Sequence, residues 1–263
     1  IEHVPRILGM RQNQVMMEEE YPQEMSNTFK SLERNFNPWG IGFDQRGEWS
    51  EGLDLPLMAD SNASEIDVLM WVGCAGSFDS RNQKIARATA TLYKKAGVKF
   101  AILGSEEKCT GDLARRSGNE MLFQMLAGEN VETLNNYNIK KIVTTCPHCL
   151  NSIKNEYPQL GGEYEVFHHT QFINKLVEEG RLPLGSNLKD TVTFHDSCYL
   201  GRYNKEYKAP RNLLKKSTKE PFKEMKHFGK ESFCCGAGGA RMWMEEKIGT
   251  RINEVRAQEA IDT

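Results

Sequence analysis

Short apolar runs that alternate with helical segments predict an α/β fold from Ile66 onward. Residues 67–73 (DVLMWVG) form an apolar run that ends in glycine, as expected of a buried parallel strand. Residues 83–96 have the composition of a helix, and Gly97 is placed to end it. Residues 98–103 predict the next strand, so this part of the chain begins with a strand, a helix and a second strand.

The same alternation continues through the rest of the chain. Further strands are predicted at residues 141–145, 164–167 and 191–195, and further helices at residues 119–127, 170–179 and 210–216. Residues 181–189, with Pro183 and Gly185, predict a linker, and residues 221–228 lead toward a short strand. Ligands of open α/β sheets gather at the carboxyl ends of strands, and the cysteines of this chain follow such ends.

Residues 1–65 differ from the rest, because they are rich in charge and contain no cysteine. Residues 15–32 predict a surface helix. Residues 35–49 place one proline and three glycines among aromatic residues, which predicts an ordered loop whose rings pack on a neighbour. The alternative is that this loop carries a binding surface. We interpret residues 1–65 as a connecting arm.

The cysteine positions indicate a tandem duplication. Four residues recur with an offset of 125 positions: Cys109 and Cys234, Gly111 and Gly236, Arg116 and Arg241, Glu120 and Glu245. A leading cysteine precedes each set, Cys74 by 35 positions and Cys198 by 36. We therefore expect two pseudo-symmetric α/β units, at residues 66–188 and 189–263, with their cysteine loops facing a shared cleft.

The first unit has a complete set of cysteines. Cys146 and Cys149 follow a predicted strand in the motif TTCPHC, and their equivalents in the second unit would fall near positions 271 and 274, beyond Thr263. The chain also begins at Ile1 rather than at methionine. We expect the sequence to be a piece of a longer polypeptide.

Cys234 and Cys235 lie in a glycine-rich stretch, FCCGAGGARMWMEE, that runs into a segment of helical composition. Adjacent thiols close a strained ring if they bridge to each other, so both are expected to face a metal cluster. The glycines, Gly236 among them, supply backbone freedom beside a bulky inorganic group. A helix starting nearby would direct its positive N-terminal end at anionic sulfur.

Composition narrows the class of protein. The 263 residues suffice for two compact domains, and 39% are hydrophobic. A net charge of −2 with a pI near 6.4 excludes a basic nucleic-acid-binding surface. Mean hydropathy is −0.59, and no apolar run is long enough to span a bilayer. Seven cysteines, an odd number, argue against a secreted disulfide scaffold, so we expect a soluble segment in the reducing cytoplasm.

Four thiolates, at Cys74, Cys109, Cys146 and Cys149, are sufficient either for tetrahedral zinc or for a [4Fe-4S] cluster. Spacing alone does not choose between them. Zinc ribbons usually use two short C-x-x-C pairs, whereas this set has one, and its other cysteines come singly from distant strand ends. A wide cavity lined from three loops favours the multi-atom cluster, and zinc is the alternative.

Other candidate residues have two interpretations each. His148 either tunes a cluster by hydrogen bonding or fills a solvent-facing turn. His195 and Asp196 either donate to sulfur or substrate or form a polar pair at a strand end, and the second interpretation is favoured. Two further expectations are that His168 and His169 lie at the surface and that Met242, Trp243 and Met244 pack in the core.

Several motifs together resemble a known family. They are VGCAGSFD, KCTGD, TTCPHC, HDSCYLGRYN, the pair Pro210 and Arg211, and FCCGAGGARMWMEE. Over residues 67–263 the chain resembles the cysteine-rich CCG-domain proteins. These include heterodisulfide reductase catalytic subunits, iron–sulfur subunits of glycolate and lactate oxidases, and membrane-associated iron–sulfur proteins that pass electrons from electron-transfer flavoprotein to quinone. Residues 1–58 resemble the last group more particularly.

The resemblance implies a role for each unit. The family pattern is a single cysteine, then Cys-Cys-Gly, then C-x-x-C. Thr110 replaces one cysteine of the first unit, which implies an ordinary [4Fe-4S] relay cluster there, beside Gly111. The second unit keeps Cys198, Cys234 and Cys235, and with a downstream pair it would bind a second, non-cubane iron–sulfur cluster that performs catalysis. With three of five ligands in this sequence, we expect that second site to be incomplete, empty or filled by a smaller ion.

The resemblance also implies partners. The electron donor would be electron-transfer flavoprotein or another redox subunit, and the acceptor a quinone or a thiol/disulfide pair. A ferredoxin-like module and a membrane segment would precede this chain in the full-length protein, which would lie at the cytoplasmic face of the membrane. The alternative function is a zinc-binding structural or regulatory module without redox activity.

Overall fold

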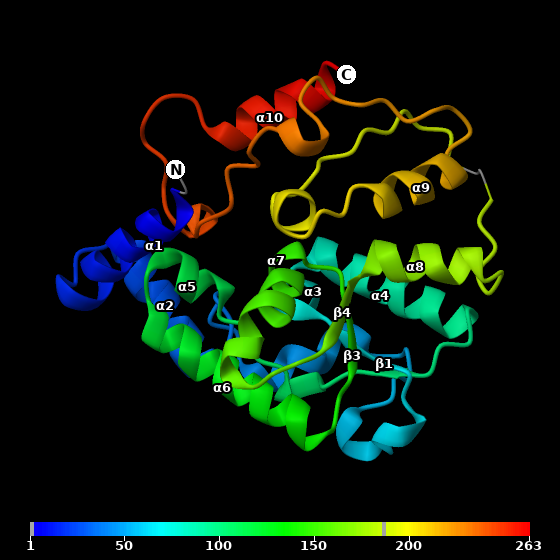
Figure 1. Ribbon diagram of the computed structural model, residues 1–263, viewed down its shortest axis with the longest axis horizontal. Helices are drawn as coiled ribbons and strands as arrows, with labels where there is room; N and C mark the ends of the chain where they lie inside the picture. Colours follow the sequence, from blue (N-terminus) through cyan, green and yellow to red (C-terminus); the bar gives the residue numbers. More distant parts are fainter. Residues whose placement is uncertain (1–2, 186–187) are drawn as a thin grey trace.

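A parallel sheet of four strands lies at the centre of the computed structural model, which describes residues 3–185 and 188–263 (Figure 1). The strand order is β2-β1-β3-β4. The strands are β1 Val68–Trp71, β2 Phe100–Ala101, β3 Lys141–Thr144 and β4 Glu165–His168. All three pairings are parallel, for example Leu69 with Ile142 and Val143 with Phe167. The predicted α/β fold is confirmed.

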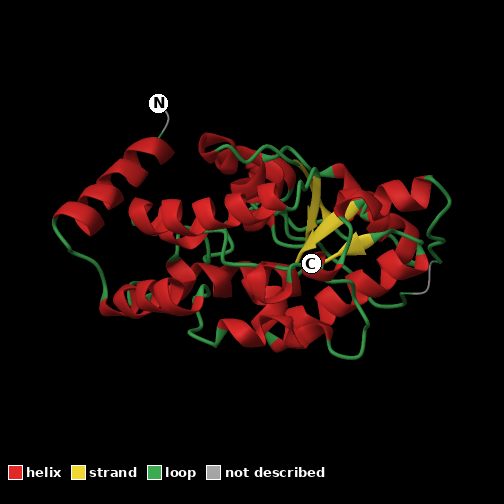
Figure 2. Cartoon of the chain, turned by 90° about the horizontal axis from the view of Figure 1, so that it is seen from below, coloured by secondary structure: helices red, strands yellow, loops and turns green. Residues whose placement is uncertain are grey.

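Helices surround the sheet (Figure 2). The α-helices are α1 Val4–Gln12, α2 Gln23–Asn35, α3 Gly73–Phe78, α4 Ser80–Lys95, α5 Asp112–Ser117, α6 Glu120–Asn136, α7 Pro147–Asn151, α8 His169–Glu178, α9 Lys208–Ser217 and α10 Ile252–Ile261. Short π-helical segments are η1 Asn13–Met17, η6 Ser152–Glu156 and η8 Tyr199–Tyr203. Short 3-10 segments are η2 Phe43–Ser50, η3 Met58–Asp60, η4 Ala63–Glu65, η5 Gly104–Glu106, η7 Tyr157–Leu160, η9 Gly229–Glu231 and η10 Arg241–Trp243.

The core is divided in two by the sheet, because successive side chains of a strand point to opposite faces. In β1, Leu69 and Trp71 pack with residues of α2 and α6, whereas Val68 and Met70 pack with residues of α4 and α8. All four β1 side chains are buried. This agrees with the apolar run that predicted a parallel strand covered on both faces.

The arm is more closely packed than the sequence predicted. Instead of one surface helix over residues 15–32, α1 and η1 end before Pro22, and α2 begins after it. Met25, Phe29 and Leu32 of α2 are buried in the core beside α6. The aromatic loop does anchor its rings, since Trp39 packs edge-on against Trp243 with ring centroids 5.0 Å apart. The arm is therefore part of the sheet domain's core.

The second unit is less regular than the first. The strand predicted at residues 191–195 is wrong in extent, because only Thr193 bridges, in parallel, to Lys223. A second parallel bridge joins Leu188 to Thr218. Figure 1 shows this half, in yellow to red, along one side of the sheet domain, where η8 contacts α7 and α9 contacts α8. Two residues of the predicted linker, 186 and 187, lie outside the described part of the chain, as do residues 1 and 2 of the arm.

Among the described residues, no helix is both long and apolar enough to cross a membrane.

His168 corrects the expectation of a surface histidine, because it is buried at the end of β4. Its Nε2 lies 3.1 Å from the Thr145 carbonyl oxygen and its Nδ1 lies 2.7 Å from the Thr170 hydroxyl. Burial lowers the pKa of His168 to about 4 and that of the neighbouring His169 to about 3. The folded protein thus holds both imidazoles neutral.

We expect acid to destabilise the fold through His168. Its pKa falls from 6.5 in the unfolded chain to about 4, so the stability it confers is complete above pH 6.5 and is lost as the pH falls toward 4. Lowering the pH from about 7 to about 5 should cost roughly 2 kcal/mol of unfolding free energy through this residue. Urea unfolding at both pH values measures the loss. His168→Gln should reduce it, whereas the exposed His3→Gln should not; equal losses in the two variants would contradict the assignment.

Candidate functional site

The four cysteines of the first unit line one cavity of about 170 Å³. Cys74 lies in α3, directly after β1, and Cys146 and Cys149 lie at α7, directly after β3. Cys109 precedes α5. Because parallel strands end at the same edge of the sheet, these loops converge there. Cys109 and Cys149 are buried, and Cys74 and Cys146 are half-buried.

The four thiols form two adjacent pairs. Cys109 hydrogen-bonds Cys74 and lowers the pKa of Cys74 to about 7, against the effect of burial. Cys149 likewise lowers the pKa of Cys146 to about 6. The pKa values of the two donors, Cys109 and Cys149, are raised, first by these hydrogen bonds and then by burial. Two thiolates are therefore available near neutral pH, and thiolates are the form that binds metals.

Glu107 fixes the backbone before Cys74. Its carboxylate accepts hydrogen bonds from the backbone N–H groups of Val72 and Gly73, both at 2.8 Å. Gly73 has a φ of +77°, and a Cβ there would lie 3.3 Å from the Cys149 sulfur. Only glycine fits this close approach without strain. No sequence pattern indicates either residue's role, because Glu107 lies 34 positions from Gly73.

The arm contributes a second buried charge, Arg46. Its guanidinium lies 2.8 Å from Glu107 and 3.5 Å from the Cys74 sulfur. This residue was predicted only as part of an aromatic loop, and no local motif marks it. The arm therefore reaches the first cysteine site directly.

His148 lines the first cavity and is not a solvent-facing filler. Its Nδ1 lies 2.7 Å from the Asp112 carboxylate. Although burial opposes it, Asp112 raises the pKa of His148 to about 9, and Cys146 and Cys235 contribute to the rise. The imidazolium thus stands between the cysteines of the two units. Asp112 is in turn held by Arg116, at 3.1 Å.

Cys234 and Cys235 line a separate cavity of about 330 Å³ in the second unit. The N–H of Gly236 points at the Cys234 sulfur at 3.3 Å, and that of Ala237 points at the Cys235 sulfur at 3.5 Å. Successive backbone N–H groups of this kind stabilise anionic sulfur. The helix expected after the glycines is wrong, since only the single 3-10 turn η10 forms there.

Among the described residues, Cys198 is not one of those that line the cavity of Cys234 and Cys235. It begins η8, and the Arg202 guanidinium lies 3.0 Å from its sulfur. The structure thus brings together two of the three predicted cysteines of this unit.

His195 corrects the favoured interpretation of a strand-end polar pair, because it hydrogen-bonds Cys235. This bond, with the N–H groups that follow, lowers the pKa of Cys235 to about 6. Arg256 donates from Nε to His195 Nδ1 at 3.0 Å, which leaves Nε2–H as the donor to sulfur. Asp196 does have a structural role, since its carboxylate pairs with both Nη atoms of Arg211 at 2.7 Å.

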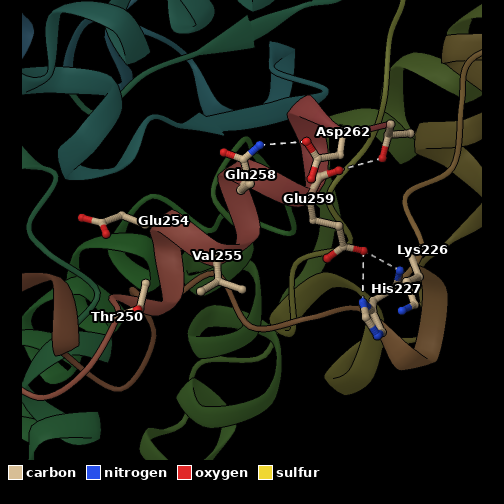
Figure 3. A pocket seen from close by; sticks show the side chains of 9 residues that line it. Lys226, His227, Thr250, Glu254, Val255, Gln258, Glu259 and Asp262 are labelled. Atoms are coloured by element: carbon tan, nitrogen blue, oxygen red, sulfur yellow. Dashed lines mark hydrogen bonds and ion pairs between the residues drawn. The ribbon is translucent and has the colours of Figure 1, made fainter.

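A wider hollow of about 670 Å³ lies beside α10 (Figure 3). Within the described part of the chain, no cysteine lines it. Its Glu259 accepts from the backbone N–H of His227 and, at 2.7 Å, from the guanidinium of Arg256. Glu259 thus holds Arg256, which contacts His195 of the second cysteine site, and the hollow itself is not part of that site.

Gly111 and Gly236, expected beside a cofactor, occupy equivalent positions. Both have a left-handed φ, +81° and +77°. A Cβ at Gly111 would lie 2.8 Å from Phe123 of α6, and one at Gly236 would lie 2.8 Å from the backbone nitrogen of Asn253 in α10. Each glycine thus lets its cysteine loop turn against a following helix. This shared geometry agrees with the duplication.

The second unit also covers the first cavity. Ala237, Ala240, Met242 and Trp243 line it together with Trp39 of the arm. The expected core packing is wrong for Met242, which is 62% exposed, whereas Trp243 and Met244 do pack against the core. Cysteine loops of both units therefore meet at one cavity wall.

The cysteine-lined cavity fits a multi-atom group. A single zinc ion binds sulfur at about 2.3 Å and therefore needs its four ligands close around one point. Within residues 3–185 and 188–263, no three His, Cys, Asp or Glu side chains are placed to hold one metal ion. Four cysteines around a cavity are the donor set of an iron–sulfur cluster.

Comparisons with known proteins agree with this donor set. The chain is 45% identical to the EtfAB:quinone oxidoreductase of Syntrophomonas wolfei and 44% identical to the probable iron-sulfur-binding oxidoreductase FadF of Bacillus subtilis. Each match covers 99% of this chain and 38% of the relative. It is 32% identical to a subunit of the dihydromethanophenazine:CoB–CoM heterodisulfide reductase of Methanosarcina barkeri, over 75% of this chain and 49% of that one. No solved structure matches.

The chain thus spans less than half the length of these relatives. The family described as cysteine-rich domain (CCG) matches it twice, at residues 68–154 and 192–263, so that one match falls within each of the two predicted units. These matches include all seven cysteines. The chain belongs to the cysteine-rich domain (CCG) family of iron–sulfur proteins.

Proposed function

We propose that the first unit binds a [4Fe-4S] cluster through Cys74, Cys109, Cys146 and Cys149. The observation that carries this proposal is the single cavity of about 170 Å³ that all four thiols line. When bound, such a cluster accepts and releases single electrons. The protein's own part is to hold the thiols in place through Glu107, to exclude water by burial, and to supply positive charge beside the sulfurs. Zinc is not favoured, because a relative that matches 99% of this chain is named a probable iron-sulfur-binding oxidoreductase.

We further propose that the second unit, with Cys198, Cys234 and Cys235, binds a second iron–sulfur cluster in the full-length protein and is the site of partner chemistry. Cys234 is exposed and Cys235 is half-buried, so this site is open to a partner. The first site is closed by comparison, since Cys109 and Cys149 are buried. In this proposal the first unit relays electrons to or from the second.

The proposed reaction of the whole protein is electron transfer from an electron-transfer flavoprotein to a quinone. A relative that matches 99% of this chain is named for these two partners. Other modules of a longer polypeptide would complete it, at the cytoplasmic face of the membrane where a quinone is reached. A thiol/disulfide acceptor is the alternative, and it is supported by the likeness to a heterodisulfide reductase subunit.

Anaerobic reconstitution with iron and sulfide tests the first proposal. We expect the full-length protein to take up iron and acid-labile sulfide and to show a visible charge-transfer absorption. Cys146→Ser should remove about four iron and four sulfide per chain, because one of the four ligands is lost. Thr145→Ser, one position earlier, should keep them. Uptake of stoichiometric zinc in place of iron and sulfide, under the same conditions, would refute the proposal.

A further inference from the structure

Arg46 is a charged residue that is almost fully buried, with 2% of its surface exposed. Its Nη2 lies 3.5 Å from the Cys74 sulfur and 2.8 Å from Glu107, and its Nη1 lies 3.4 Å from the Phe36 carbonyl oxygen. The same carbonyl accepts from the backbone N–H of Cys109 at 2.9 Å. One guanidinium thus connects the arm to the loops of two cysteines.

The second unit has the same kind of contact by a different route. Arg202 follows Cys198 by four positions and lies 3.0 Å from its sulfur. The residue four positions after Cys74 is Phe78. The guanidinium of Arg46 lies over the ring of Phe78, 5.7 Å from its centroid. Each unit therefore has a guanidinium beside the sulfur of its first cysteine, supplied by the arm in the first unit and by the unit itself in the second.

We propose that Arg46 is a positioning residue that donates a hydrogen bond to the Cys74 thiolate and thereby raises the reduction potential of the first-unit cluster. This inference rests on the function proposed above. It makes the arm part of the electron-transfer site, a role that neither the cysteine motifs nor the match to residues 68–154 assigns to it.

Arg46 would raise the reduction potential because reduction adds negative charge to the cluster. A reduced cluster carries one more negative charge than an oxidised one, and hydrogen bonds to its sulfurs stabilise that charge. Arg46 keeps its own charge, because a guanidinium is not deprotonated in proteins. Glu107, at 2.8 Å, offsets part of the charge of Arg46, so Arg46 acts on the sulfur mainly as a directed N–H donor, and burial keeps that hydrogen bond from being screened by solvent. Arginine also has a fixed planar fork, which lysine lacks.

Comparison with Arg87 separates a role in setting the reduction potential of the cluster from a role in anchoring the arm. Arg87 of α4 also anchors the arm, since it donates to the carbonyl oxygens of Trp49 at 2.6 Å and Glu51 at 3.0 Å. It contributes no bond to sulfur in the described part of the chain. Arg87→Met is therefore a matched control for loss of anchoring.

The test is a redox titration of full-length protein followed by electron paramagnetic resonance, in which the first-unit signal is the one that Cys146→Ser removes. In Arg46→Met we expect the ratio of reduced to oxidised cluster at a fixed potential to fall at least tenfold, which is a shift of about −59 mV for one electron. Arg46→Lys should lie between Arg46→Met and the unaltered protein. Arg87→Met should stay within twofold.

Each other outcome decides the matter. A loaded Arg46→Met whose ratio stays within twofold of that of the unaltered protein would overturn the proposal, as would a loaded Arg46→Lys whose ratio is higher than that of the unaltered protein. If neither variant takes up iron, unchanged thermal unfolding of the iron-free forms supports a role in positioning Cys74, whereas a lowered unfolding temperature shows an anchoring role and overturns it. Failure of the unaltered protein to take up iron and sulfide would instead refute the proposed function.

Discussion

In the full-length protein, Cys235→Ser is expected to lower turnover with its electron acceptor by at least about 100-fold, while the spectrum of the first-unit cluster remains. Changes at residues that merely support a ligand typically cost 10-fold to 100-fold, and the loss of a direct ligand should cost no less. The Cys235 sulfur lies in the open cavity of the second unit and receives hydrogen bonds from His195 and Ala237. Serine would keep the size of the side chain and lose the thiolate.

The complementary variant is Cys109→Ser, which should remove the first-unit spectrum as well as turnover, because a relay without its cluster passes no electrons. Steady-state quinone reduction and electron paramagnetic resonance of the same samples measure both effects. If turnover survives in Cys235→Ser and is lost in Cys109→Ser, chemistry takes place at the first unit and the roles are reversed.

How well each strand could be predicted depended on what covers it. Residues 67–73 are a continuous apolar run, and β1 is covered on both faces. Residues 191–195 (TVTFH) alternate in character, and none of these side chains is buried, so only one residue of the segment forms a bridge. A parallel strand is stable when helices cover both of its faces, and here they do not. The repeat in sequence therefore predicted more regular structure than the second unit has.

The cysteines were predictable because their motifs are local, and their partners were not. Arg46 and Glu107 are 61 positions apart, and a buried ion pair between such distant residues leaves no periodic pattern in the sequence. His195 meets Cys235 across 40 positions for the same reason. His168 was misplaced because its burial comes from its position at the end of β4 and not from its neighbours in sequence.

The end of α6 was predicted wrongly for a different reason. Residues 119–127 were predicted as its extent, but the helix continues through Gly128 to Asn136. The buried Val131 and Leu134 contribute apolar contacts that hold this last part in place. A Cβ added at Gly128 would meet no atom within 4 Å, so this glycine is merely tolerated in the helix.

Gly111 presents the opposite case, and Gly111→Ala is expected to lower the free energy of unfolding by about 3 kcal/mol. Its φ of +81° strains any residue with a Cβ, and the added carbon would lie 2.8 Å from the Phe123 ring and 3.2 Å from that residue's backbone. Because Phe123 is fixed in α6, the backbone cannot yield, and the Cys109 loop must shift instead. Urea unfolding of the iron-free protein isolates this cost from metal binding.

Gly128→Ala, inside α6, is the matched control, because it adds the same methyl group to the helix that Gly111 approaches. It should raise the free energy of unfolding by about 0.5–1 kcal/mol, because alanine loses less backbone entropy than glycine and meets open space. Opposite signs for the two substitutions would show that the close approach of α5 to α6 sets the position of Cys109. A cost below about 1 kcal/mol for Gly111→Ala would mean that the loop can relax, and the glycine would then not be what holds this cysteine at the cavity.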